Sequence, residues 1–349
     1  MSRLGRSRRC LLSLLLAACT THVPLASEGA PWWDPAWNSR MPISLHYDER
    51  QAVTDVPVLV VLDPSHFDGA RASPEGRDLR FVERASGRVI PHEIESWDAS
   101  GTSFVWVLVP TIAAGPDQPV IDLYYGNGSA APSSRAVGGV FDAYAAVYHL
   151  DASARDASPL GIDGTVRGTR SVPGLAASAM QFDSNADRIE FAAPDRFPSG
   201  AQTVCAWVRP DTFGGDHHVA FQHGDTDVRH ELSLSRDGDA VDCWLGTTLM
   251  FHVPAALAIG HWSHTCCVAP GAGSALYIDG EAMARAPQDQ AITPGPGWIG
   301  VESPAAGYPW QGALDEIRVF DGVRSDLFIR TEYRAVEGSL VVLHPTETF

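Results

Sequence analysis

The sequence contains no lysine, so its 25 basic residues are all arginine, and they stand against 42 aspartates and glutamates for a net charge of −17. Nucleic acids and anionic lipid surfaces attract proteins that carry a basic footprint. This chain has an acidic excess instead. We therefore exclude nucleic acid and anionic lipid headgroups from the expected partners.

Long hydrophobic runs are also missing. The apolar run at Leu11–Ala18 spans eight residues, whereas a helix that crosses a bilayer needs about 20. Four arginines precede this run, and small residues end it just before Cys19. The order of charged, apolar and small residues is typical of an export signal rather than of a membrane-spanning helix.

The end of this segment, Leu16-Ala17-Ala18-Cys19, resembles the lipobox of bacterial lipoproteins, in which the cysteine is acylated and becomes the new N-terminus. The resemblance implies a signal peptide over residues 1–18, an acylated Cys19 and a spacer over 19–31. Thr20 stands where a membrane-retention aspartate would be, which favours lipid anchoring to the bacterial outer membrane or cell surface. Ordinary signal cleavage after Ala26 is the alternative.

Helical periodicity is scarce, and six short β-like segments follow one another in the first part of the chain. Turn clusters divide them, which is typical of an antiparallel β-sandwich over residues 32–129. Residues 130–140 then have the composition of a linker. The six segments are Met41–Tyr47, Val56–Leu62, Leu79–Glu83, Val89–Trp97, Phe104–Pro110 and Val120–Tyr125.

Residues 141–349 carry roughly a dozen further strand-like segments, which predicts two stacked sheets in a jelly roll. Ser339–Leu343 is the predicted last strand of this jelly roll. A single helix is expected over residues 326–337, where Ser325 can cap the N-terminus. The sequence therefore predicts an all-β protein with two sandwich domains.

A hairpin over residues 261–281 is central to this second domain, because two alternating apolar runs there flank a Gly/Pro turn. Cys266 and Cys267 fall on opposite faces of its first strand. Together with Cys205 and Cys243 they permit three disulfide pairings, and disulfides persist in exported proteins. Free buried thiols are the alternative.

Two sets of motifs resemble known families. WNSRMPISL, DLRFVE, IPHEIESWD, VWVLVP and IDLYYGNGSA resemble a bacterial domain family of unknown function over residues 33–129. AVYHLDASARDASPLGIDG, AMQFDSNADRIEF, TVCAWVRP and GALDEIRVFDGVRSDLFIRTEYRA resemble the concanavalin A-like, laminin-G/pentraxin superfamily over residues 141–338. That superfamily includes lectins, adhesion modules, pentraxins and glycoside hydrolases, so the fold alone does not choose a function.

The pentraxin resemblance implies a disulfide between Cys205 and Cys266, which leaves Cys243 to pair with Cys267. Related jelly rolls often hold a structural Ca²⁺ with an aspartate at the place of Asp315, and Ca²⁺ prefers such oxygen ligands. Asp183 and Asp187 could line a second loop of this site, together with Asn185. Turn or salt-bridge roles are the simpler alternative for these residues.

No catalytic group is visible. The hydrolases of this fold carry E-x-D-x-x-E or E-x-D-x-E on one strand, and the chain has no such run. Glu93-Ile94-Glu95 alternates suitably but lacks a third carboxylate, and a solvated sheet face explains it. G-x-S-x-G, H-E-x-x-H and Walker-type motifs are also absent. We therefore predict that the protein is not an enzyme.

Aromatic residues near residue 300 are the candidates for ligand contact. Trp298 and Trp310 occupy positions where the family keeps core aromatics, so burial is expected for both. Tyr308, in a Gly/Pro-rich loop, is the expected exposed aromatic.

The resulting hypothesis is a non-catalytic cell-envelope lipoprotein whose laminin-G-like domain binds a glycan or protein through its loops. A structural envelope component that docks onto a protein partner is the alternative, and a glycoside hydrolase with an unfamiliar carboxylate pair is a remote one.

Overall fold

A computed structural model describes residues 31–115, 118–132, 139–191, 194–213, 217–225, 229–234, 238–254, 256–269, 271–287, 292–305 and 307–349. The predicted signal peptide over residues 1–18 and the predicted acylation site Cys19 lie outside these residues, as does most of the predicted linker over 130–140. From Trp33 to Phe349 the chain forms one compact unit.

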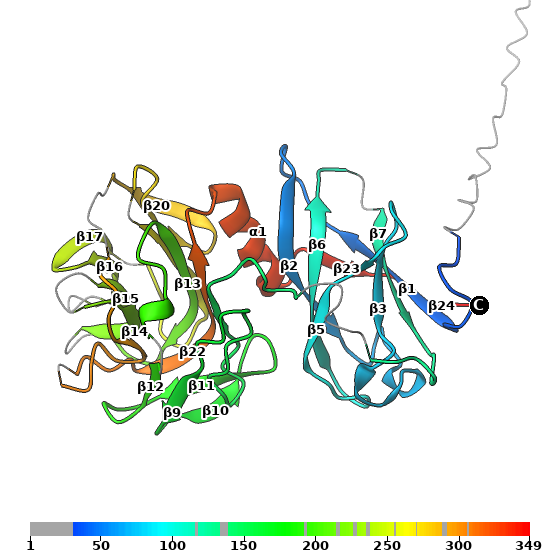
Figure 1. The fold of residues 1–349 in the computed structure, drawn as a ribbon, viewed down its shortest axis with the longest axis horizontal. Helices are drawn as coiled ribbons and strands as arrows, with labels where there is room; N and C mark the ends of the chain where they lie inside the picture. The colour runs from blue at the N-terminus through cyan, green and yellow to red at the C-terminus, as the bar shows by residue number, and fades with distance from the viewer. Residues whose placement is uncertain are drawn as a thin grey trace, which may run out of the picture. The chain divides into compact units, whose positions relative to one another are not determined.

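Two sheets form the amino-terminal sandwich (Figure 1). One has the strand order β23-β1-β7-β3-β4, with β24 also paired to β1, and the other has the order β2-β6-β5. Single-turn 3₁₀ helices occur at Gly69–Arg71 and Pro74–Gly76. The strands are β1 Ser39–Leu45, β2 Val53–Leu62, β3 Arg80–Glu83, β4 Val89–Ile90, β5 His92–Ser96, β6 Ser103–Ile112, β7 Pro119–Tyr125, β23 Val341–Leu343 and β24 Glu347–Thr348.

The predicted strand Val89–Trp97 is two strands in different sheets. Ile90 pairs with Phe81 of β3, whereas His92 pairs with Val107 of β6. Pro91 stands between them. Proline has no N–H to donate to a ladder, so it marks a natural point for the chain to change sheets.

The last strands belong to the amino-terminal sandwich. Ile43 of β1 lies opposite Leu343, and Arg40 lies opposite Glu347, whose carboxylate pairs with the Arg40 guanidinium. The prediction that Ser339–Leu343 completes the jelly roll is therefore wrong. Strand alternation alone could not identify the partner, because the open edge of β1 lies about 300 residues away in the sequence.

Two sheets also form the jelly roll, which confirms the predicted all-β class. One has the order β10-β11-β22-β13-β18-β19-β20, with β8 paired to β22, and the other has the order β17-β16-β15-β14-β21-β12-β9 (Figure 1). A 3₁₀ turn follows β12 at Pro194–Arg196. The strands are β8 Ala146–Tyr148, β9 Gly164–Arg167, β10 Arg170–Pro173, β11 Ser178–Phe182, β12 Arg188–Phe191, β13 Gln202–Pro210, β14 His218–His223, β15 His230–Leu234, β16 Val241–Leu245, β17 Thr248–Val253, β18 Ser263–Ala269, β19 Ala275–Ile278, β20 Glu281–Arg285, β21 Gly297–Ile299 and β22 Gly312–Asp321.

The predicted hairpin is present as β18 and β19, and Asp279-Gly280 makes the turn into β20 with positive φ at both residues. Cys266 and Cys267 point to opposite sides of β18, as the alternation requires. Cys267 pairs with Cys243 inside the jelly-roll core, and Cys266 pairs with Cys205 on the other side of the sheet. Both expected disulfides are confirmed.

Helix α1 covers Asp326–Glu337, as predicted, and the Ser325 hydroxyl accepts a hydrogen bond from the backbone N–H of Phe328. Ile329 packs beside the Cys205–Cys266 disulfide. Phe328 and Val336 instead join the core of the amino-terminal sandwich. The helix therefore packs against both sandwiches. In the part of the chain that the structure describes, no helix has the length and apolar character needed to cross a membrane.

Candidate functional site

The outer face of the seven-stranded sheet of the jelly roll carries the most distinctive group of side chains. Phe221, Leu232, Cys243 and Ile299 belong to the core on the inner face. Because successive side chains of a strand point to opposite faces, their neighbours along each strand point outward. These outward residues include Gln222, Glu231, Trp244 and Trp298.

Strand register aligns these residues across the sheet. Trp244 lies opposite Glu231, Glu231 opposite Gln222, Gln222 opposite Trp298, and Trp298 opposite Glu190. Side chains that lie directly opposite one another in antiparallel strands share a face and are close enough to interact. We call Trp244, Glu231, Gln222, Trp298 and Glu190 the outer row. Both of its tryptophans are half-buried.

The carboxylate at the centre of the outer row is held by two neighbouring basic side chains. Glu231 is fully buried, and its two oxygens contact His217 Nε2 at 2.5 Å and Arg229 Nε at 2.8 Å. Arg229 also reaches Glu302 Oε1 at 3.0 Å. Burial alone would raise the pKa of Glu231, but the His217 and Arg229 partners hold that pKa below its usual value. Glu231 therefore orders the site as a buried anion.

His217 connects the outer row to Tyr308. The His217 ring lies edge-on to Trp244, with centroids 5.8 Å apart, and edge-on to Tyr308, with centroids 5.6 Å apart. Tyr308 is half-buried and has a φ of 56°, in the left-handed region that non-glycine residues rarely adopt. The structure thus places the predicted ligand-contact residue beside the outer row. Its contact with a ligand stays a prediction.

The outer row retains unused hydrogen-bonding capacity. Gln222 Oε1, Trp244 Nε1 and the nearby Ser233 Oγ are buried and have no hydrogen-bond partner among the residues that the structure describes. Unpaired polar atoms away from water cost about 1–3 kcal/mol each, so native proteins keep few of them.

Trp298 is not a core residue, and the expectation that it would be buried like Trp310 is wrong. Trp310 is 1% exposed and belongs to the jelly-roll core. Trp298 instead precedes the inward Ile299 on β21, so it must face outward. The motif predicts a tryptophan at this position, but the alternation of side chains along β21 decides which face of the sheet it occupies.

The three predicted calcium ligands each have local partners. Asp187 Oδ2 accepts hydrogen bonds from the backbone N–H groups of Asp183 and Ser184, at 2.8 and 2.9 Å, and so closes its own loop. Asp183 pairs with Arg170 at 3.2 Å. Among the described residues, these aspartates do not form a three-member group of acidic or histidine ligands with Asp315.

Asp315 is completely buried on β22, and its Oδ2 accepts a hydrogen bond from the Leu175 N–H at 2.8 Å. Burial, together with the charge of Glu316, raises the pKa of Asp315 well above its usual value. A carboxyl that favours the neutral form is a weaker ligand for Ca²⁺. Calcium binding by Asp315, Asp183 and Asp187 stays a prediction.

His223, His230 and His264 are buried histidines that pack within the jelly roll. Burial lowers the pKa of His223 to about 3 and that of His230 to about 4. His223 contacts Gln202 of the opposite sheet at 2.7 Å. His230 lies near Cys243, and His264 lies near Cys266, but both sulfurs are already bonded in disulfides. These groups therefore do not offer free thiolates to a metal ion.

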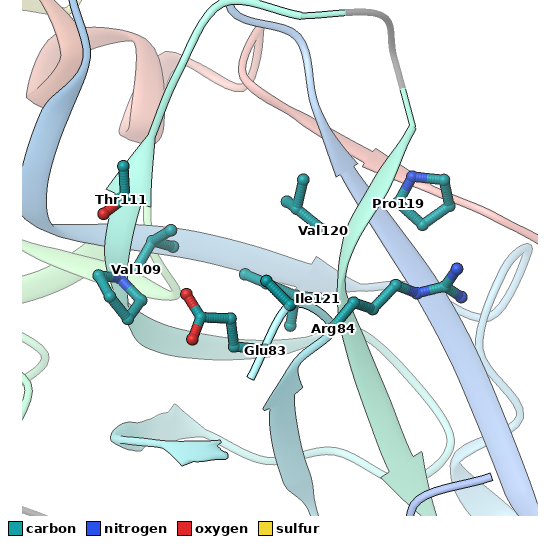
Figure 2. Close-up of a pocket in the computed structure, with 9 residues that line it drawn as sticks. Glu83, Arg84, Val109, Thr111, Pro119, Val120 and Ile121 are labelled. Carbon is teal, nitrogen blue, oxygen red and sulfur yellow. The ribbon is translucent and has the colours of Figure 1, made fainter. Parts of the chain in front are cut away.

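A cleft of about 410 Å³ opens in the amino-terminal sandwich between the ends of β3, β6 and β7 (Figure 2). Glu83, Val109, Thr111 and Ile121 are among its lining residues. Its arginine, Arg84, pairs with Asp122 at 2.6 Å, and Glu83 accepts a hydrogen bond from Ser86. The charged groups of this cleft are thus engaged within the sandwich.

Residues 183–330 match the model of the concanavalin A-like lectin/glucanases superfamily, and residues 75–153 match that of a domain of unknown function, DUF2341. Both resemblances are confirmed. The second match begins after the predicted opening strand and extends past β8 into the jelly roll. Among curated proteins, none matches the sequence.

Solved structures that are similar to the chain include domain 4 of AbnA, a GH43 extracellular arabinanase from Geobacillus stearothermophilus, in complex with arabinotriose, at 20% identity and a TM-score of 0.45; the match covers 54% of this chain and 98% of that one. The binding domain of Paraclostridial Mosquitocidal Protein 1 is 12% identical, with a TM-score of 0.42 and a match that covers 53% of this chain and 50% of that one. The binding domain of botulinum neurotoxin serotype G is 11% identical, with a TM-score of 0.45 and a match that covers 54% of this chain and 50% of that one. The chain spans about half the length of the latter two. Identities this low do not extend the ligands of those proteins to this chain.

Proposed function

We propose that the protein is a non-catalytic binding protein whose jelly roll binds a neutral glycan across the outer row. The observation that carries the proposal is the placement of Trp244 and Trp298 on one sheet face, on either side of Glu231 and Gln222. Binding sites combine aromatic surface with a few positioned polar groups. Tryptophan rings offer flat apolar surface to the C–H faces of sugars, and the buried Glu231 and Gln222 hold the strands that carry the two rings in register.

The charge of the site favours a neutral ligand. The chain as a whole is acidic, with a net charge of −17. The basic side chains nearest the outer row, the imidazole of His217 and the guanidinium of Arg229, are already engaged with Glu231. An anionic sugar would therefore meet repulsion from the protein without a dedicated cation to offset it.

The carboxylates of the outer row are unsuited to glycoside hydrolysis. That reaction requires a general acid whose pKa is raised so that it holds a proton near neutral pH. The Arg167 partner holds the pKa of Glu190 below its usual value, with a further contribution from Arg188. The pKa of Glu231 is also lowered. Both carboxylates are therefore ionised near neutral pH and neither can serve as the general acid, which supports binding without catalysis.

Lipid anchoring through Cys19 is a separate part of the proposal and depends on the lipobox-like sequence alone. Attached acyl chains contribute about 0.8 kcal/mol per buried CH₂, so several chains would hold the protein durably on the outer membrane or cell surface. Mass spectrometry of the membrane fraction should find acylated Cys19 at the N-terminus. An unmodified Cys19 in that fraction would contradict the anchor.

The glycan proposal is tested with an array of neutral oligosaccharides, followed by calorimetric titration of the best ligand. Trp244→Ala and Trp298→Ala should each weaken binding about tenfold or more, which corresponds to about 1.4 kcal/mol. Trp262→Ala is the matched control, because Trp262 is a half-buried tryptophan beside Arg209, outside the outer row. The same incubation is analysed for cleaved products.

A blank array, or equal binding by the wild type and both outer-row variants, would contradict the proposal. A stoichiometric protein partner recovered alongside a blank array would favour the docking alternative. Hydrolysis of the oligosaccharide would show that the protein is an enzyme after all.

A further inference from the structure

A group of ionisable side chains lies buried where the two sandwiches meet. Glu95 comes from β5 of the amino-terminal sandwich, whereas His149 and Glu316 come from the jelly roll, just after β8 and within β22. One ligand atom from each lies within 4.8 Å of the others. We call Glu95, His149 and Glu316 the interface cluster. The interpretation of Glu93-Ile94-Glu95 as a solvated face is wrong for Glu95, whose side chain is 1% exposed.

One ring nitrogen of His149 faces both carboxylates. Its Nδ1 lies 2.6 Å from Glu316 Oε1 and 3.8 Å from Glu95 Oε2. The other ring nitrogen, Nε2, lies 3.8 Å from Glu93 Oε1, and the Glu93 side chain is 38% exposed. The cluster is therefore closed on the Nδ1 side, while Glu93 provides a route to solvent on the other.

A backbone irregularity aims Glu316 at the cluster. Cys205 pairs with Arg318 and Trp207 pairs with Asp315, so two residues of β22 stand opposite one residue of β13. Glu316 lies in this bulge with a φ of 47°. β-Bulges are common where a strand must redirect a side chain. A glutamate keeps a left-handed backbone conformation only when the surrounding structure enforces it.

The region around the cluster holds more buried carboxyl groups than buried basic groups. Four carboxyl groups, those of Glu95, Asp315, Glu316 and Glu332, are at most 1% exposed. Arg318 is the one guanidinium buried among them, and it lies 2.7 Å from both Glu316 and Glu332. Buried charges in proteins are paired or bound to metal ions. Arg318 pairs with Glu316 and Glu332 but not with Glu95, whose basic neighbour in the cluster is His149.

Within the described part of the chain, two buried atoms of the cluster make no hydrogen bond. Glu95 Oε1 and His149 Nε2 are shielded from solvent and make no hydrogen bond, although Glu95 Oε2 accepts one from Trp106 Nε1 at 2.7 Å. His149 is 8% exposed. The buried Glu95 Oε1 points to a missing partner that accepts a lone pair, whereas Nε2 of His149 lies on the side of the ring that faces Glu93.

We propose that the interface cluster binds a divalent transition-metal ion, with Zn²⁺ as the reference, through Glu95, Glu316 and Nδ1 of His149. One imidazole with two carboxylates is a ligand set that Zn²⁺ accepts. Zn–N and Zn–O bonds of about 2.0–2.2 Å place ligand atoms roughly 3–3.5 Å apart, between the two separations observed. The Nδ1 proton leaves to solvent, and Nε2–H then donates toward Glu93, as a metal-bound histidine commonly does to an outer carboxylate.

The ion would join the two sandwiches, since Glu95 belongs to one of them and the other two ligands belong to the other. Metal binding that requires the folded arrangement stabilises it. Zinc should therefore protect the junction of the two sandwiches more than the interior of either.

The experiment uses the purified full-length chain, freed of metal with chelator and titrated with Zn²⁺ in competition with a chromogenic chelator. We expect one equivalent to bind, and the melting temperature to rise with Zn²⁺. Glu95→Gln, which keeps the shape of the side chain, should weaken binding at least tenfold and abolish the melting shift. His149→Gln should do the same. His66→Ala is the matched control, because His66 is an exposed histidine beside Asp63.

Substitution of Co²⁺ for Zn²⁺ adds a spectroscopic readout, because its visible absorption reports nitrogen and oxygen ligation and should be lost in Glu95→Gln. The proposal is overturned if the folded wild type binds no ion. Equal zinc affinity in the wild type and Glu95→Gln, or loss of binding in His66→Ala alone, would overturn it as well.

Discussion

The two sandwiches of this chain are built from the same kind of strands but use their faces differently. In the amino-terminal sandwich, Trp106 on β6 is fully buried and contacts Phe141 of the jelly-roll segment, with ring centroids 5.9 Å apart. In the jelly roll, the outer row occupies a sheet face with half-buried tryptophans. One sandwich therefore uses a sheet face for internal packing, and the other leaves a sheet face with partly exposed tryptophans.

The two sandwiches also differ in how their cores are held together. All four cysteines of the described disulfides belong to the jelly roll, and residues 32–129 contain no cysteine. The amino-terminal sandwich depends on apolar packing and on strands from the far end of the chain. Both disulfides therefore lie in the sandwich that carries the outer row, and the other sandwich has none.

The largest expected effect is acid destabilisation of the jelly roll. Burial lowers the pKa of His223 and His264 to about 3 and that of His230 to about 4, from the ordinary 6.5. Because the unfolded histidines bind a proton more readily than the folded ones, their contribution to the free energy of unfolding is fully present above about pH 6.5. It is lost as the pH falls toward 3. At pH 5 the loss is about 2 kcal/mol for each histidine.

Hydrogen exchange at pH 7.5 and pH 5 checks this prediction strand by strand. The amino-terminal sandwich has His92 with a similarly lowered pKa of about 4, so its loss should be smaller. His223→Gln should flatten the pH dependence of the jelly roll. If the amino-terminal sandwich lost its exchange protection before the jelly roll at pH 5, the predicted difference between the two sandwiches would be wrong.

Trp106→Ala should cost about 3–5 kcal/mol of unfolding free energy, because it removes a fully buried side chain from the junction. Trp106 also lies under the Arg318 guanidinium, 4.4 Å from the ring centroid, and donates to Glu95. Denaturant unfolding should show both sandwiches losing stability. Val120→Ala, at an exposed position, is the control, and an effect confined to the amino-terminal sandwich would contradict the prediction.

The disulfides should stabilise only the jelly roll. On the chain-entropy model, the Cys205–Cys266 link, with a sequence separation of 61, contributes about 4 kcal/mol, and Cys243–Cys267, with a separation of 24, contributes about 3.5 kcal/mol. Paired Cys→Ser variants should lower jelly-roll protection in that order. Equal loss of protection in residues 32–129 would remove this contrast between the sandwiches.

Deletion of residues 341–349 should have the opposite regional effect. It removes β23 and β24 from β1, along with the ion pair between Arg40 and Glu347. At about 0.5–1.5 kcal/mol per hydrogen bond, the loss is on the order of 2–4 kcal/mol. Fluorescence-detected unfolding should show the change in the amino-terminal sandwich, and a jelly roll destabilised instead would contradict the strand assignment.

Local sequence signals predicted the elements of the fold well. Ser325 before an amphipathic segment predicted α1, and alternation around Cys266 and Cys267 predicted the opposite directions of the two disulfides. Local signals could not predict that Leu343 pairs with Ile43 of β1. Alternation shows that a segment is a strand, but it does not show which distant edge is open to it.

The candidate site was harder to predict for the same reason. Tyr308 could be singled out from its loop composition, whereas Trp298 was assigned to the core because its motif does not state which face of the strand it occupies. Glu95 lacked any signal of burial, because the surface that covers it comes from a segment more than 50 residues later. Outward tryptophans on neighbouring strands, found from register, were the signal that could have located the outer row.

The return of β23 to β1 also has a bearing on synthesis. The residues that complete the first sheet are synthesised about 300 residues after β1, so the edge of Ile43 stays uncovered while the intervening chain is made. An uncovered strand edge invites pairing with other chains. Prematurely terminated products would therefore expose an adhesive edge, and cellular proteases could recognise them as incomplete.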